Sequence, residues 1–250
     1  MSDFDNEKDT NKDKPNNQAQ HSWTKLSIRS ILKAEALKKC KTLLDGGNLV
    51  IRNEGDTEDY LWQSFDYPSD TLLPGMKLGW NLQTGLERRI TSWKSPDDPS
   101  IGNYSWCLML HNYPEFYLMR GTQKYHRIGP WNGLHFSRVP NQTSNPFYEF
   151  KYTAHNAVVY ASNKAEMFYS FTLKNSSVLV RVTVIEGGFQ TFVWEKDKTQ
   201  WQIHESTPRD RCDLYGMCGA NGNCRIKDTP LWQCLKGFSP KSPPEWNTSN

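Results

Sequence analysis

The sequence predicts an all-β fold in which turn residues separate short strands. Residues 176–185 alternate valine with Leu, Arg, Thr and Ile, which is the period of a strand with one buried face. Two glycines at 187–188 end this run, and two further runs follow at 189–194 and 199–204. The three runs predict an antiparallel meander, and short strands at this spacing are typical of a sandwich, a barrel or a prism.

The first 40 residues have a different character. Residues 1–22 are rich in Asn, Asp, Lys and Gln, a composition that predicts disorder. Residues 23–39 repeat apolar side chains near a period of 3.6, so we expect a short helix that packs on its own domain or rests on a membrane or a partner. The segment lacks the apolar stretch of a signal peptide, and no run in the chain approaches the ~18 apolar residues of a transmembrane helix. We therefore expect neither a signal peptide nor a transmembrane segment in this chain.

The strand pattern begins near residue 42. Residues 43–51, with the sequence LLDGGNLVI, read as a strand, a Gly turn and a second strand. Residues 60–65 and 89–93 are short aromatic or β-branched runs. The Asp, Pro and Ser residues at 66–70 and 95–99 follow these runs, and such segments are typical of turns.

The composition indicates a folded chain without a nucleic-acid partner. Hydrophobic residues make up 36% and charged residues 23%, so the 250 residues suffice for one large or two small domains. The net charge of +3 is spread along the chain and forms no basic stripe, which argues against nucleic-acid binding. The 10 tryptophans either fill sheet cores or form a recognition surface, because such rings combine apolar area with a polar handle.

The cysteines are unevenly placed along the chain. Cys40 and Cys107 stand alone, whereas four others lie in one short stretch: Cys212, Cys218, Cys224 and Cys234. This cluster, with its many turn residues, predicts a small disulfide module in an oxidising compartment. Zinc is the alternative, but the cluster has no CxxC pair, so we expect no metal site and no other cofactor. Candidate glycosylation sites are the sequons at Asn103, Asn141, Asn175 and Asn247.

Catalytic motifs are missing from the sequence. No HExxH, GxSxG or phosphate-loop motif occurs, and the histidines are scattered. Asp66 and Asp70 invite comparison with the paired carboxylates of glycosidases. They lie in a Pro/Ser turn, however, where an Asx turn is the favoured role for an aspartate. We therefore expect no catalytic residues and no enzyme activity.

Several stretches between residues 43 and 246 carry a resemblance to a known family. They are LLDGGNLVIR at 43–52, YLWQSFDYPSDTLLPGMKLGW at 60–80, RITSWKSPDDPSIGNYSW at 89–106, PEFYLMRG at 114–121, RIGPWNGLHFS at 127–137, CDLYGMCGANGNC at 212–224 and CLKGFSPKSPPEW at 234–246. In their order and spacing these stretches resemble the plant S-locus glycoprotein family and its relatives, the G-type lectin S-receptor-like serine/threonine-protein kinases.

The resemblance implies an all-β, extracellular or plasma-membrane-associated recognition module. In this family a bulb-type lectin domain, a β-prism, precedes a second lectin-like S-locus domain and an EGF-like Cys-rich module. The expected limits are an unmatched segment at 1–40, a partial lectin domain at 41–80, an S-locus domain at 81–207 and a truncated EGF-like module at 208–250. The implied function is cell-surface recognition and signalling, including recognition of pollen in some members.

The chain departs from the family pattern at the lectin motif. Of the sugar-binding pattern QxDxNxVxY, only Asp45, Asn48 and Val50 remain; an extra glycine shifts the spacing, and Arg52 stands near the place of the tyrosine. We expect this segment to be kept for its strand–turn geometry rather than for mannose binding.

Two further departures concern the cysteines and the kinase. The resemblance to an EGF-like module implies a disulfide between Cys212 and Cys224. It also implies that Cys218 lacks its usual partner, because position 232 is not a cysteine. Cys234 is a possible substitute for that partner, and spacing alone does not decide whether Cys218 and Cys234 pair. No HRD or DFG motif occurs, so the kinase domain of the receptor relatives is absent from this chain.

Three interpretations stay open at this point. The first is a recognition module that binds a protein ligand or co-receptor at the cell surface through flat β surfaces. The second is a carbohydrate-binding lectin with a mannose-type glycan as its partner. The third is a truncated gene product without a function of its own, which the partial lectin domain and the missing signal peptide would fit.

Overall fold

The computed structural model describes residues 39–55, 59–110, 114–130, 136, 146–154, 166–229 and 231–243. The chain divides into two compact units, Met1–Ser64 (unit 1) and Phe65–Asn250 (unit 2). The predicted disorder at 1–22 lies outside the described residues, and so does the predicted helix at 23–39, apart from its last residue, which begins a strand. Among the described residues, no helix is long and apolar enough to span a bilayer.

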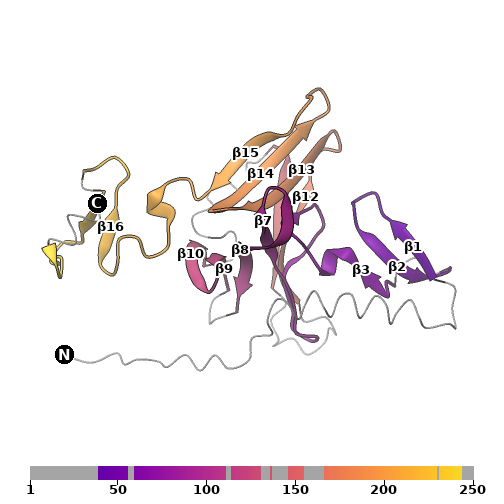
Figure 1. The fold of residues 1–250 in the computed structure, drawn as a ribbon, viewed down its shortest axis with the longest axis horizontal. Coiled ribbons are helices and arrows are strands. Elements are labelled where there is room, and N and C mark those ends of the chain that lie inside the picture. Colours follow the sequence, from indigo (N-terminus) through magenta and orange to yellow (C-terminus); the bar gives the residue numbers. More distant parts are fainter. Residues whose placement is uncertain are drawn as a thin grey trace. The chain divides into compact units, whose positions relative to one another are not determined.

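Unit 1 contains a three-stranded antiparallel sheet in the order β1-β2-β3. Its strands, drawn in indigo and violet in Figure 1, are β1 (Lys39–Leu43), β2 (Leu49–Asn53) and β3 (Trp62–Gln63). The tight turn between β1 and β2 is closed by two hydrogen bonds, from the Gly47 amide to the Leu44 carbonyl and from the Leu44 amide to the Asn48 carbonyl. Gly47 adopts a φ of 86°, which a glycine reaches without a steric cost. The predicted strand, Gly turn and strand at 43–51 are therefore confirmed.

The described part of unit 2 contains three four-stranded antiparallel sheets, besides a small two-stranded sheet in the Cys-rich segment. The first, in the order β10-β9-β8-β7, contains β7 (Ile90–Ser95), β8 (Asp98–Met109), β9 (Glu115–Arg120) and β10 (Gln123–Ile128). The second, β11-β12-β5-β6, contains β5 (Leu78–Asn81), β6 (Leu86–Arg88), β11 (Tyr148–Ala154) and β12 (Glu166–Leu173). The third, β15-β14-β13-β4, contains β4 (Thr71–Leu72), β13 (Val178–Ile185), β14 (Gly188–Glu195) and β15 (Gln202–Thr207).

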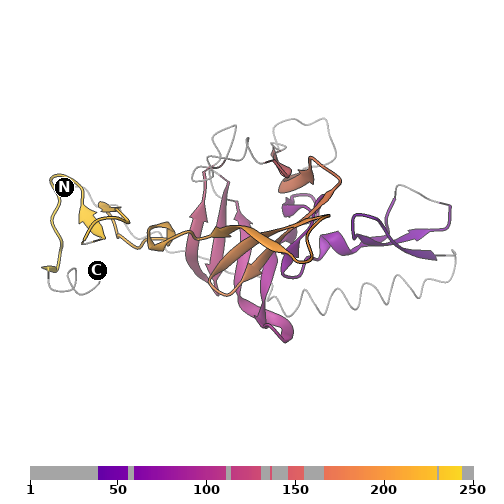
Figure 2. The same ribbon diagram turned by 90° about the horizontal axis from the view of Figure 1, so that it is seen from above.

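The third sheet confirms the predicted meander. Strands β13, β14 and β15 pair antiparallel in sequence order, and their orange arrows lie side by side in Figure 1 and Figure 2. The buried face predicted from the alternation along β13 is confirmed, because the four valines at 178, 180, 182 and 184 are buried whereas the side chains between them are not. The sheet therefore has one face in the core and one face toward solvent.

All three sheets of unit 2 contribute to a single hydrophobic core. Aromatic rings dominate its centre: Trp106 of β8 stacks on Phe189 of β14, with ring centroids 4.5 Å apart and planes 8° from parallel. Tyr169 of β12 meets the edge of Trp106 at 5.8 Å, so one ring from each sheet joins this cluster. The all-β fold class is confirmed for the described part of the chain, in which strands and two 3-10 turns, η1 (Ser64–Asp66) and η2 (Arg211–Asp213), are the regular elements.

Residues 65–95 contribute strands to all three four-stranded sheets of unit 2. They supply β4 to the third sheet, β5 and β6 to the second, and β7 to the first. At β5 the contact is close, because a side chain added at Gly79 would meet the Met167 carbonyl oxygen at 2.2 Å. The segment 65–80, which we expected in the lectin domain, thus folds within the compact unit that also holds the S-locus segment. A compact unit is not a family-domain limit, so the expected limits stay predictions.

The Cys-rich segment contains a small two-stranded sheet of β16 (Gly222–Cys224) and β17 (Trp232–Cys234). Ahead of it, η2 is capped by Asp210, whose carboxylate accepts a hydrogen bond from the Cys212 amide at 2.7 Å. Residues just after η2 pair with β10, through the Tyr215 amide and the Tyr125 carbonyl at 2.8 Å. The description of this segment as an EGF-like module stays a prediction.

Candidate functional site

The remnant lectin motif does not assemble into a sugar site in unit 1. Asp45 is exposed in the β1–β2 turn, whereas Asn48 is 7% exposed and Val50 is fully buried. Arg52, near the place of the motif's tyrosine, pairs with Cys40 across the β1–β2 ladder. The three sequence-predicted residues therefore lie in three different environments.

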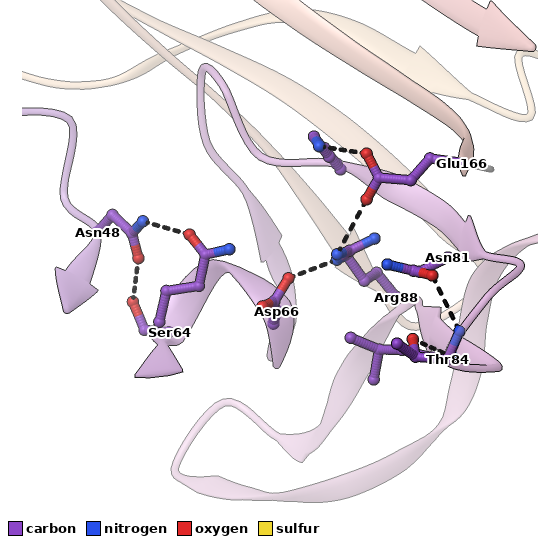
Figure 3. Close-up of polar contacts among 10 residues, drawn as sticks. Asn48, Ser64, Asp66, Asn81, Thr84, Arg88 and Glu166 are labelled. Atoms are coloured by element: carbon purple, nitrogen blue, oxygen red, sulfur yellow. Dashed lines mark hydrogen bonds and ion pairs between the residues drawn. The ribbon is translucent and has the colours of Figure 1, made fainter. Parts of the chain in front are cut away.

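The Asn48 side chain is held by protein groups on both of its polar ends. Its Nδ2 donates to Gln63 Oε1 at 2.9 Å, and its Oδ1 accepts from Ser64 Oγ at 3.1 Å (Figure 3). The same Ser64 Oγ accepts from the Leu49 amide at 2.9 Å. This network ties the start of β2 to β3 and the residue after it, so Asn48 acts in this geometry as a structural amide.

A charged network in unit 2 accounts for Asp66. The Arg88 Nε donates to Asp66 Oδ1 at 2.6 Å, and Arg88 Nη2 lies 3.3 Å from Glu166 Oε1 (Figure 3). Lys77 completes the network with a 2.6 Å contact from its Nζ to Glu166 Oε2. Arg88 is 5% exposed, so the guanidinium is buried between two carboxylates. The network joins β6, β12 and the turn before β4, which is a structural role.

Opposing effects act on the Glu166 carboxyl. Burial would raise the pKa of Glu166, but the hydrogen bonds and positive charges of Lys77 and Arg88 outweigh burial and hold this pKa below its ordinary value. The carboxylate is therefore ionised at neutral pH and fully engaged in the ion pairs, which does not fit a general acid. Asp70, the other candidate carboxylate, accepts hydrogen bonds from the hydroxyls of Ser69 and Thr71.

The solvent face of the third sheet gathers apolar side chains around one arginine. Leu179 and Ile203 are 56% and 58% exposed, and the rings of Trp194 and Trp201 meet edge to face at 5.8 Å. Arg181 places its guanidinium carbon 5.0 Å from the Phe192 ring centroid and 4.7 Å from that of Trp201. We call this set the aromatic face: Leu179, Arg181, Phe192, Trp194, Trp201 and Ile203.

A cavity inside unit 2 is too small for a sugar. It measures about 50 Å³, and its lining includes the rings of Trp106, Phe116 and Tyr169 together with Glu205 and Arg209. A cavity of about 150 Å³ is known to accommodate one benzene molecule. The cavity can therefore hold a few water molecules but no sugar ring.

Two family models match the sequence. The S-locus glycoprotein domain matches residues 126–242, and the D-mannose binding lectin domain matches residues 11–94. An S-locus-specific glycoprotein of Brassica oleracea is 42% identical over 217 residues, which cover 85% of this chain and 48% of that relative. A G-type lectin S-receptor-like serine/threonine-protein kinase of Arabidopsis thaliana is 38% identical over 234 residues, which cover 90% of this chain and 25% of that relative.

The chain belongs to the S-locus glycoprotein family, together with its receptor-kinase relatives. It spans about half the length of the curated S-locus glycoproteins that it matches and about a quarter of the receptor kinases. The lectin match is wider than the expected 41–80 and includes part of the segment 1–40 that we expected to be unmatched. The S-locus match starts later than the expected residue 81 and continues through most of the Cys-rich segment.

The Cys-rich segment of this family member contains one disulfide among the described residues, between Cys212 and Cys224. This is the pair that EGF-like logic implies. Cys234 carries a free thiol, so the structure does not join it to Cys218. No cluster of three His, Cys, Asp or Glu side chains that could hold a metal occurs among residues that the structure describes.

Two of the four sequons lie on described parts of the chain. Asn103 is exposed on β8, and Asn175 is exposed in the turn between β12 and β13, where its side chain accepts from the Ser177 amide at 2.8 Å. Asn141 and Asn247 lie outside the described residues. The exposed positions can carry glycans without displacing core side chains, and glycosylation stays a prediction.

Sequence reasoning missed both the buried charge network and the aromatic face. Lys77 and Glu166 are 89 residues apart, and no local pattern connects them. A weak signal existed for the aromatic face, because Leu179 and Arg181 occupy the solvent side of the alternating run and Trp194 ends the next one. That signal did not show that the rings of Trp201 and Phe192 would both contact the arginine.

Proposed function

We propose that this chain is a non-catalytic recognition module of an S-locus-type receptor or secreted glycoprotein, which binds a protein ligand or co-receptor outside the cell. Its relatives include S-locus-specific glycoproteins and S-receptor-like kinases, which supports a role in recognition. Recognition of pollen, as in some members of the family, is the biological context that we propose for it.

The observation that carries the choice of a protein partner is the engagement of Asn48. In the lectin motif this amide would bind sugar hydroxyls, but here it forms hydrogen bonds with the side chains of Gln63 and Ser64. A sugar would have to compete with bonds that hold β2 to β3, and each such bond left unmade costs about 1–3 kcal/mol. Protein recognition through an exposed sheet requires no such exchange.

A second candidate function is mannose binding, which the match to the D-mannose binding lectin model favours. Asp45 is exposed and free to meet a hydroxyl, although Val50 is fully buried in the sheet. Asp45 and Asn48 therefore make a matched pair of probes for this alternative.

The test compares Asn48→Ala and Asp45→Ala in the full chain secreted from plant cells, with binding to mannoside arrays and thermal unfolding as readouts. We expect no mannoside binding, lower stability in Asn48→Ala and unchanged stability in Asp45→Ala. Mannoside binding by the native chain that both substitutions abolish would overturn the choice of a protein partner in favour of the lectin.

The location has its own test, which is the intact mass of the protein from its native tissue before and after glycosidase and reductant. Loss of glycan mass and a mass gain on reduction are the expected results, because passage through the secretory route adds glycans and closes disulfides. An unmodified and fully reduced chain would contradict the proposed extracellular role.

A further inference from the structure

We propose that the aromatic face binds a peptide segment of a partner protein in which an Asp or Glu carboxylate is flanked by apolar side chains. The proposal deepens the proposed function and rests on it, because it assigns the protein partner to one surface and one chemistry. The carboxylate is received by Arg181, and the flanking apolar residues cover Leu179 and Ile203.

The register of the third sheet brings the members of this face together. Leu179 of β13 pairs with Trp194 of β14, and Arg181 pairs with Phe192 in the same ladder. Phe192 in turn pairs with Ile203 of β15. Residues opposite each other on one face of an antiparallel pair have Cβ atoms about 5 Å apart, so these side chains form a continuous surface across three strands.

The Arg181 guanidinium lacks a counter-ion on this face. Among the described residues it forms no ion pair, and its buried Nε has no hydrogen-bond partner. Five other arginines of unit 2 have carboxylate partners: Arg88 with Asp66, Arg89 with Glu87, Arg127 with Glu115, Arg209 with Glu205 and Arg225 with Asp228. Arg120 and Arg211 resemble Arg181 in lying over an aromatic ring, but each contacts one ring whereas Arg181 contacts two. A guanidinium without a counter-ion leaves its charge uncompensated, so a partner that brings a carboxylate to this group gains a charge-assisted contact.

The ring contacts prepare this arginine for a planar acceptor. Phe192 and Trp201 both lie within 5.0 Å of the guanidinium carbon, which restricts the orientation of the group before any partner arrives. A guanidinium held in this way presents paired N–H donors that match the two oxygens of a carboxylate. Charge complementarity therefore specifies an acidic group as the centre of the ligand.

Stabilisation of the sheet alone explains only part of this surface. Cross-strand aromatic and cation–π contacts account for Phe192, Trp194 and Trp201, and each contributes roughly 0.2–1 kcal/mol at such a site. They do not account for Leu179 and Ile203, which remain more than half exposed beside the rings. Aromatic residues and Arg are enriched in protein interfaces, and here Leu179 and Ile203 extend the apolar surface around them.

The test measures binding of the secreted full chain to an array of seven-residue peptides. Each peptide carries a central Asp or Glu between apolar residues, and each has a matched peptide with Asn or Gln in place of the acid. We expect binding to a subset of the acidic peptides and not to their amide counterparts, with affinity that falls as salt is raised because the pair is charged. Equal binding to acid and amide peptides, or binding to neither, would refute the proposal.

Two variants identify the surface. Arg181→Glu should reduce binding about tenfold or more by repelling the acid, whereas the matched Arg225→Glu, in the Cys-rich segment, should leave it unchanged. Thermal unfolding of both variants separates a binding defect from a folding defect, and Arg181→Lys should retain partial binding if charge is the cause. Peptide binding that survives Arg181→Glu would overturn the assignment to this face.

Two other outcomes identify a different occupant. A native dimer in sedimentation that Arg181→Glu converts to monomer would assign the face to a second copy of this chain and refute the peptide proposal. Mannoside binding lost in both Asp45→Ala and Asn48→Ala would instead refute the proposed function, whatever the peptide array shows. Failure of the peptide array with silent mannoside arrays refutes this inference alone, because other surfaces then remain for a protein partner.

Discussion

Replacing Arg88 by Leu should destabilise unit 2 strongly. The substitution keeps an apolar side chain of moderate size but removes the cation that lies between Asp66 and Glu166. The Arg88 side chain is 5% exposed, and the side chains of Asp66 and Glu166 are 23% and 13% exposed. Water can therefore replace the lost cation at Asp66 only in part, and even less at Glu166.

The expected loss of stability is about 3 kcal/mol, the lower end of the roughly 3–5 kcal/mol for removing one partner of a buried ion pair. Three features favour the lower end. Lys77 still forms an ion pair with Glu166, and the Asp66 side chain keeps some solvent contact. Arg88 Nη1 also has no hydrogen-bond partner among the described residues in the native protein, so no bond is lost there. For a domain of this size, about 3 kcal/mol corresponds to a fall in Tm of roughly 6–12 °C.

The assay is urea unfolding followed by tryptophan fluorescence, together with a thermal melt. Arg225→Leu is the matched control, because Arg225 also pairs with a carboxylate but at side-chain exposures of 61% and 34%. An exposed pair contributes about 0–1 kcal/mol, so the control should stay within that range. If Arg88→Leu changed stability no more than the control does, the view of this network as a clamp between β6, β12 and η1 would be wrong.

Two further predictions concern the same sheet. The pKa of Glu166 is lower in the folded protein than in the unfolded chain, so its ionised form stabilises the fold above the ordinary carboxyl pKa. This stability is lost as the pH falls through the folded pKa, and the urea midpoint should therefore drop on acidification. The drop should be smaller in Glu166→Gln, which has no carboxyl group to protonate at this position. Gly79→Ala should cost more than about 1 kcal/mol, because Gly79 has a φ of 144° and the added carbon would meet Met167. Gly46→Ala, with open space around it, is the control and should have little effect on urea unfolding.

Local patterns were sufficient for the meander of β13, β14 and β15 and for the β1–β2 turn. The four valines of β13 alternate with Leu179 and Arg181, and this period alone distinguishes a buried from an exposed face. The two glycines of the β1–β2 turn likewise mark the reversal, because φ above zero is easily reached by glycine. These features depend on neighbours in the sequence, which is why the prediction succeeded.

The sites were less accessible to sequence reasoning. Asn48 was identified through a motif, but the motif could not show that Gln63 and Ser64 engage its amide. Asp66 was expected to form an Asx turn, which stays a prediction, and sequence reasoning did not anticipate its ion pair with Arg88, which joins two elements. Each of these contacts depends on which strands lie beside each other.

The sequence by itself determined the all-β class, the buried face of the meander, the clustered cysteines and membership of the S-locus glycoprotein family. Tertiary structure alone decided that Arg88 lies between two carboxylates and that Arg181 lies against the rings of Phe192 and Trp201. The physical reason is that side-chain periodicity is a local property of a strand, whereas ion pairs and surface clusters arise from strand order and register. Those are set by packing one core from three sheets, with residues far apart in the chain.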